Sequence, residues 1–208
     1  MQRWQRQCRS AMELKMNSGG VRATVALLAA VGCGSLLLAQ KPPTAGSPDA
    51  AVVHEFEGKV KQYVDFRRKT VGQAPTSTNN AADIVSTQRE MADKVRVARA
   101  GAKQGEIFDP RVAQYFRKQI AASVAGPHGK QIRSSLRGAE PVNMELQINQ
   151  SYPQNVPLQS TPPTLLMNLP ELPDHLEYRL MNRELVLRDA EINLVVDYIP
   201  NALPEPIK

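Results

Sequence analysis

Apolar positions recur at helical spacing in the part of the chain that follows residue 48. Segment 49–71 carries apolar side chains three and four residues apart, which would share one face of a helix: Val53, Phe56, Val60, Tyr63 and Val64. Arg67, Arg68 and Lys69 fall in its last turns, where cations offset the helix dipole. The pattern predicts a first helix that ends before Gly72.

The same spacing predicts further helices. Segment 81–102 would present a weaker apolar face made of Ile84, Met91, Val95 and Ala98. Asp109-Pro110 predicts the start of another helix, because Asp caps a helix well and Pro suits its first position. The core face of that helix would be Val112, Phe116, Ile120 and Val124. After the break at 126–129, segment 130–136 predicts a shorter helix.

From Pro141 onward the apolar pattern changes to alternation, which is typical of strands. Segment 176–199 alternates three times with short polar breaks, the first at Asn182-Arg183, and this predicts a three-stranded antiparallel meander. Segment 143–150 also alternates and could add a fourth strand. Between these lies the Pro-rich passage 152–173, within which 161–166 could begin one short helix.

Helices first and strands later predict an α+β fold: three or four helices followed by a small antiparallel sheet of three to four strands. The expected organisation is a leader over 1–39, a Pro-rich linker over 40–48, one domain over 49–200 and an irregular tail over 201–208.

The leader determines where we expect the protein to act. Residues 23–39 carry no charge, and basic residues precede them: Arg3, Arg6, Arg9, Lys15 and Arg22. A helix of this length spans roughly 25 Å, less than the ~30 Å hydrocarbon core, which favours a cleaved export signal ending at Ala39. A retained inner-membrane anchor over 21–39 and a lipoprotein linked at Cys33 remain alternatives. Translation could start at Met1 or at Met16.

Composition changes this picture in two ways. Both cysteines, Cys8 and Cys33, lie in the leader, so a processed chain could form neither a disulfide nor a thiolate metal site. The net charge of +6 is carried partly by the leader, which makes it a weak argument for nucleic acid. Bases concentrate before residue 138 and acids after it, a pattern that attraction between two halves of one fold explains.

Four cations on the predicted helix 81–102 and just past its end form the first candidate site. At 100° per residue, Arg89, Arg96, Arg99 and Lys103 would fall within about 80° of one another as a basic stripe. A solvated outer face is the usual meaning of such a stripe. The functional alternative is a surface for an anionic polymer or lipid headgroup.

His128 is the second candidate, because Gly126-Pro127-His128-Gly129 would present its imidazole on a tight turn. A solvent-exposed loop histidine without a role is the plainer interpretation. The three histidines show no metal-ligand spacing, and the chain has neither a Gly-x-Ser-x-Gly elbow nor a phosphate-binding loop placed after a strand. No catalytic residue, metal or cofactor is therefore expected.

Several segments resemble a family of uncharacterised exported bacterial proteins that have a helical N-terminal part and a C-terminal β-meander. The resemblance is carried by segments 99–110, 162–166, 176–179 and 193–200. It implies an exported protein but brings no established activity and no site residues.

Together these observations favour an exported, non-enzymatic binding module, periplasmic or secreted, whose partner is another envelope protein, an anionic polymer or a lipid. Nucleic acid is not an expected partner, and membrane contact is expected only through the N-terminal segment. The alternatives are a membrane-tethered scaffolding protein that keeps its leader, and an enzyme without a recognisable motif.

Overall fold

The computed structural model describes residues 47–72, 80–137, 145–152 and 161–205. All of them belong to one unit of the chain, Gln40–Lys208. The predicted leader and nearly all of the predicted linker lie outside these residues.

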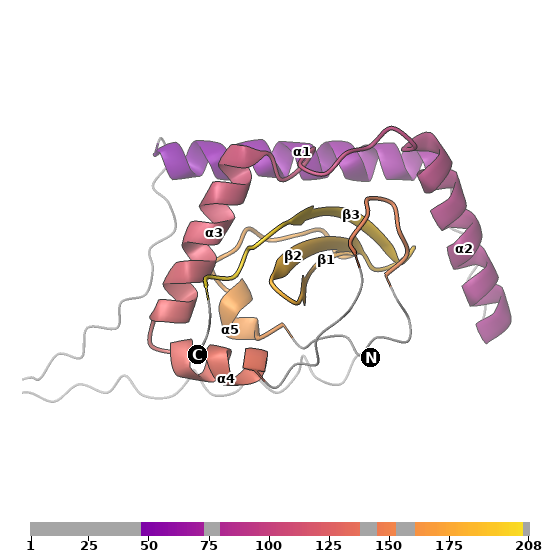
Figure 1. The fold of residues 1–208 in the computed structure, drawn as a ribbon. Coiled ribbons are helices and arrows are strands. Elements are labelled where there is room, and N and C mark those ends of the chain that lie inside the picture. The colour runs from indigo at the N-terminus through magenta and orange to yellow at the C-terminus, as the bar shows by residue number, and fades with distance from the viewer. Residues whose placement is uncertain (1–46, 73–79, 138–144, 153–160, 206–208) are drawn as a thin grey trace, which may run out of the picture. The chain divides into compact units, whose positions relative to one another are not determined.

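The predicted α+β class is confirmed, with helices preceding one antiparallel sheet of order β1-β2-β3 (Figure 1). The helices in the described ranges are α1 Pro48–Val71, α2 Ala81–Ala98, α3 Pro110–Ala125, α4 Gly129–Arg137 and α5 Pro163–Leu166. The strands are β1 Leu176–Met181, β2 Glu184–Asp189 and β3 Leu194–Ile199.

The start of α3 is confirmed, and α1 begins at a capping residue as well. The Asp109 carboxylate accepts hydrogen bonds from the backbone N–H groups of Arg111 and Val112, and Pro110 opens α3. Ser47 caps α1 in the same way through the N–H of Ala50. Local sequence therefore sets the start of both helices before any packing is considered.

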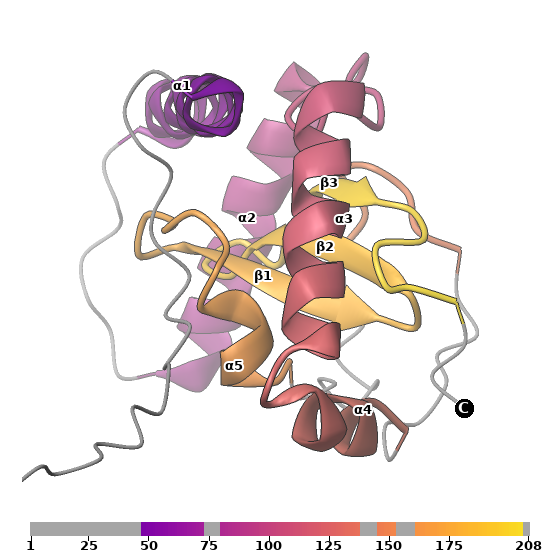
Figure 2. The ribbon, with the colours of Figure 1, turned by 90° about the vertical axis from the view of Figure 1, so that its left-hand side faces the viewer.

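The main core fills the space between the helices and one face of the sheet. α1 and α3 supply the predicted apolar faces, and α3 crosses in front of the sheet in Figure 2. Phe56, Phe108 and Phe116 meet at its centre, with ring centroids 5.0–5.6 Å apart. The sheet contributes alternate residues, among them Tyr178 and Leu187.

The other face of the sheet is also covered, so the strands are buried on both sides. Met181, Val186 and Val195 pack there against Leu146 and Tyr152. A separate cluster joins α2 to the β2–β3 turn through Met91, Ala92, Val95, Ile192 and Leu194.

The outer edge of β3 is closed by side chains and loop backbone. The Arg99 guanidinium donates to the Val196 carbonyl at 3.3–3.4 Å, and the Gln104 amide donates to the Tyr198 carbonyl at 3.0 Å. Earlier on the same edge, the Val195 N–H donates to the carbonyl of Gln150. Most of the polar edge of β3 is thus satisfied without a neighbouring strand.

Two predicted features are wrong. Residues 145–150 of the possible fourth strand are not a strand: 148–149 form a turn, with Asn149 at a φ of 63°, and the rest is irregular. Pairing is limited to an isolated bridge between Ser151 and Leu194. Positions 143 and 144 lie outside the described residues. The second helix ends at Ala98, short of residue 102.

The apolar face predicted for the second helix is also only partly buried. Met91 and Val95 are buried as predicted, but Ile84 and Ala98 are exposed. Ala92, which the spacing did not single out, is buried in their place. The buried apolar contact between α2 and the sheet is therefore confined to the C-terminal half of the helix.

Candidate functional site

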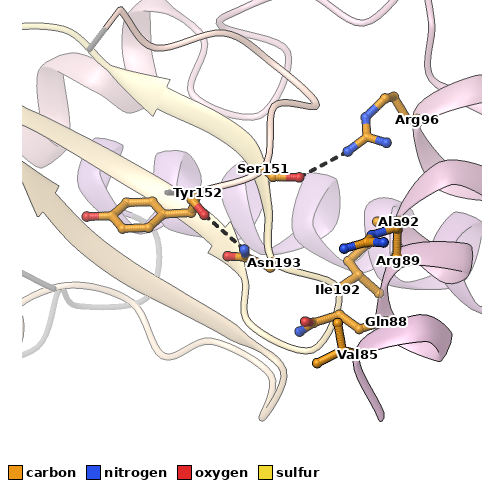
Figure 3. Close-up of a pocket in the computed structure, with 9 residues that line it drawn as sticks. All are labelled: Val85, Gln88, Arg89, Ala92, Arg96, Ser151, Tyr152, Ile192 and Asn193. Carbon is orange, nitrogen blue, oxygen red and sulfur yellow. Dashed lines mark hydrogen bonds between the residues drawn. The ribbon is translucent and has the colours of Figure 1, made fainter. Parts of the chain in front are cut away.

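A groove of about 310 Å³ lies between α2 and the sheet (Figure 3). One wall is a face of α2 made of Val85, Gln88, Arg89, Ala92 and Arg96. The opposite wall is formed by residues 151–152 and 192–193, which approach from distant parts of the sequence. We call this hollow the α2 groove.

The groove is open because only half of α2 is packed. Met91, Ala92 and Val95 lie in the cluster with Ile192 and Leu194, whereas residues 81–86 are all exposed. The first turns of the helix therefore stand free of the sheet and leave room beside it.

Arg96 is held in a fixed orientation at the edge of the groove. Its Nε donates to the Asn149 carbonyl and one Nη donates to the Ser151 Oγ, each at 3.1 Å, while the other pairs with Asp93. Asn149 belongs to the turn found where the fourth strand was predicted, and Ser151 is the bridge residue that follows it. These two residues therefore position a guanidinium that sequence analysis placed on a simple helical stripe.

Arg89 is the exposed cation of the groove. Among the described residues, no side chain or carbonyl forms an ion pair or hydrogen bond with its guanidinium. Figure 3 shows both arginines extending from α2 toward residues 151–152 and 192–193. They lie seven residues apart, about 10 Å along the helix axis, so their long side chains can approach a common ligand.

Apart from the Tyr152 hydroxyl, which is buried without a hydrogen-bond partner among the described residues, the remaining lining is apolar or already hydrogen-bonded. Val85, Ala92 and Ile192 give aliphatic surface. The Gln88 amide donates to the Glu191 carbonyl at 2.8 Å, and the Asn193 amide donates to the Tyr152 carbonyl at 2.9 Å. None of the described residues that line the groove is Asp, Glu or His. Asp93, which lies outside the lining, pairs with Arg96, so Arg89 is the groove cation for which the described residues supply no acid.

The other two members of the predicted basic stripe lie elsewhere. Arg99 follows the end of α2 and turns inward, where its side chain is only 10% exposed and its guanidinium lies 5.2 Å above the ring of Tyr63. It donates to the Asn149 Oδ1 at 3.0 Å as well as to β3. Lys103 is exposed on the loop beyond α2. The four cations therefore do not share one surface, because the helix ends before the stripe is complete.

His128 lies exposed in the turn between α3 and α4. Its backbone carbonyl accepts from the N–H of Ile132, and at the next position a Cβ on Gly129 would lie 2.0 Å from the Val124 carbonyl oxygen. The described ranges contain no cluster of three or more His, Cys, Asp or Glu side chains suited to a metal ion. The turn needs its glycine for close packing.

Two buried carboxylates escaped the sequence analysis. Asp197 is fully buried on β3 and accepts hydrogen bonds from the backbone N–H groups of Gly105, Ile107, Phe108 and Tyr198, at 2.8–2.9 Å. Segment 105–108, between α2 and α3, therefore wraps a carboxylate of its own chain. The available signal was an acid inside the apolar run 194–199, where both faces of the strand are buried.

Asp189, at the end of β2, is the other fully buried acid. It accepts from the Tyr63 hydroxyl at 3.0 Å and lies 2.7 Å from the Arg67 Nε. Burial and the neighbouring Asp189 carboxylate raise the pKa of Tyr63. This network ties the end of α1 to the sheet and gives Asp189 a structural role.

A hollow of about 340 Å³ between α1 and residues 171–173 is less suited to a charged ligand. Its charged residues have opposite signs, Glu57 and Glu171 against Lys61, and Lys61 is paired with Asp65 at 2.8 Å. The α2 groove is the better candidate site, because its described lining contains no acid and no described residue forms an ion pair with Arg89.

None of the helices in the described ranges is both long enough and apolar enough to cross a membrane. Comparison with known proteins finds no matching family model, no matching curated protein and no matching solved structure. Function is therefore inferred from the geometry of the groove.

Proposed function

We propose that the protein is a non-catalytic binding module of the bacterial envelope that takes an anionic partner in the α2 groove. The observation that carries this proposal is the guanidinium of Arg89, which pairs with no described residue, beside the oriented guanidinium of Arg96. The described lining around them contains no acid. Guanidinium groups recognise carboxylate and phosphate oxygens well because they offer several N–H donors in one plane.

Binding without chemistry agrees with the state of the polar groups in the groove. The Gln88 and Asn193 amides donate hydrogen bonds to backbone carbonyls, and the Ser151 hydroxyl accepts a hydrogen bond from Arg96. A general base would have to be Asp, Glu or His in most enzymes, and the described lining offers none. Measured turnover on a broad hydrolase panel that disappears in His128→Ala would contradict the non-enzymatic proposal.

An envelope location is supported by the leader, whose uncharged run follows five basic residues. The proposed partners there are an envelope protein, an anionic polymer or a lipid. Each can present phosphate or carboxylate groups to the groove.

The test is charge reversal at single positions. Arg89→Glu should abolish the salt-sensitive co-sedimentation of the protein with anionic phospholipid vesicles and with an anionic polymer, because it places a repelling charge in the groove. Lys103→Glu is the matched control, since it makes the same change of net charge at an exposed position outside the groove. Equal effects of the two variants would show that the groove is not the binding site.

Reversal of all four predicted cations is a poor test. Arg99→Glu would bury a carboxylate facing the Val196 carbonyl and would remove a donor from the edge of β3. Its effect on binding could not be separated from loss of the fold.

A further inference from the structure

The apolar part of the α2 groove narrows the class of ligand further than its charge does. Val85 lines the groove and is 44% exposed, so α2 presents aliphatic surface at its mouth. Ala92 and Ile192 continue that surface inward. Exposed aliphatic side chains next to a cation that pairs with no described residue match a ligand that has both an anionic and an apolar part.

We propose that the α2 groove binds an anionic amphiphile, with a phosphate or carboxylate head at Arg89 and Arg96 and a hydrocarbon chain over Val85, Ala92 and Ile192. This inference rests on the proposed function and narrows it to one class of ligand. The head would accept from Arg89 and from the Arg96 donors that Asn149, Ser151 and Asp93 leave free.

A highly charged polymer fits the groove less well. Such a ligand needs a row of cations spaced along its length, and that row is broken where Arg99 turns into the core and Lys103 moves onto the following loop. Two guanidiniums beside an aliphatic wall suit one head group and one chain. The volume of about 310 Å³ is at the small end for ligand pockets, enough for a head and a few carbon atoms.

The chemistry is shared by a lipid headgroup in a membrane and by a free anionic amphiphile. Octyl phosphate below its micelle concentration is the probe for the free form. Vesicles of phosphatidylglycerol, compared with vesicles of phosphatidylcholine, are the probe for the membrane form.

The experiment is a calorimetric titration of the natively expressed protein with octyl phosphate, inorganic phosphate and octanol. We expect octyl phosphate to bind at least about tenfold more tightly than either of the other two, because only it uses both halves of the groove. Arg89→Glu should weaken octyl phosphate binding about tenfold or more, and Val85→Ser roughly threefold to tenfold.

Two matched variants control for charge and for exposed apolar area. Lys103→Glu repeats the charge reversal outside the groove, and Val97→Ser repeats the apolar loss at a position on α2 that is 78% exposed and does not line the groove. Neither should change the affinity. Vesicle binding that depends on Arg89 would assign the ligand to membrane headgroups, and its absence beside octyl phosphate binding would assign it to free amphiphiles.

The titrations distinguish failure of the amphiphile inference from failure of the proposed anion site. If inorganic phosphate binds as tightly as octyl phosphate, and only Arg89→Glu weakens both, the amphiphile inference is wrong and the proposed anion site stands. If octanol binds as tightly as octyl phosphate and Arg89→Glu changes nothing, both proposals are wrong.

Discussion

Asp197 shows how one residue can organise a loop. Its carboxylate is fully buried and accepts from the backbone of four residues, three of which belong to the connection between α2 and α3. Charged acceptors make stronger hydrogen bonds than neutral ones, and an unpaired buried N–H is costly. The conformation of residues 105–108 therefore depends on this single side chain.

Asp197→Asn should lower the free energy of unfolding by on the order of 3 kcal/mol. The amide keeps the size of the side chain but turns one acceptor into a donor that faces backbone N–H groups. Urea denaturation measures the loss. Asp174→Asn, at an exposed position, is the control and should change stability by less than about 0.5 kcal/mol. Equal losses in the two variants would mean that the buried hydrogen bonds contribute little.

At the scale of elements, α3 is tied to α1 by the residue that caps it. Asp109 accepts from two N–H groups at the start of α3 and also pairs with Lys59 of α1. Burial opposes the charged form, but the ion pair with Lys59 and the backbone hydrogen bonds outweigh it and lower the pKa of Asp109 from 3.8 to about 2. The charged carboxylate thus supports both a helix end and a contact between helices.

This arrangement predicts a pH-dependent contribution to stability. The folded state holds the Asp109 proton less tightly than the unfolded state, so the contribution is full above about pH 4 and is lost as the pH falls toward 2. Asp109→Asn keeps a good helix cap and loses only the charge. Asp109→Ala loses both, and it should lower the free energy of unfolding by about 1 kcal/mol more than Asp109→Asn does. Urea denaturation between pH 2 and pH 6 measures each difference from the wild type.

The informative comparison is with the asparagine variant. The difference in free energy of unfolding between Asp109→Asn and the wild type should shrink as the pH approaches 2, because the wild-type carboxylate is then losing its charge by protonation. A difference that stays constant from pH 6 to pH 2 would contradict the ion-pair account.

The elements that could be predicted from the sequence are those whose signals are local. Asp109-Pro110 marks the start of α3, and the polar breaks in 176–199 mark the meander, because caps and turns act within a few residues. The end of α2 and the turn at Asn149 could not be predicted in the same way. Both depend on Arg99, which leaves the helical stripe to reach Asn149 and Val196 far along the chain.

In the candidate site, too, only the features with a local sequence signal could be predicted. The helical spacing of Arg89 and Arg96 placed both on one face of α2, and both line the groove. The opposite wall, residues 151–152 and 192–193, could not be found from spacing because it forms only when the bridge between Ser151 and Leu194 is made. The buried position of Asp197 is likewise a consequence of tertiary packing on both faces of β3.

At the scale of the whole molecule, the proposed envelope location predicts a specific processed form. If the leader is a cleaved signal, the natively expressed protein should have an intact mass that begins at Gln40 and should be recovered from a soluble periplasmic or external fraction. Mass spectrometry after cell fractionation measures this. A mass that retains residues 23–39, found in the membrane fraction after carbonate extraction, would instead support a tethered protein.

The closed edge of β3 has a consequence for aggregation. A strand whose outward N–H and C=O groups are free can recruit a strand from another molecule, and sheets grow into fibrils in that way. Arg99 and Gln104 occupy the carbonyls of Val196 and Tyr198, so a second copy would have to displace them before it could pair. Resistance to fibril growth at this edge therefore depends on the connection between two helices, outside the sheet that it protects.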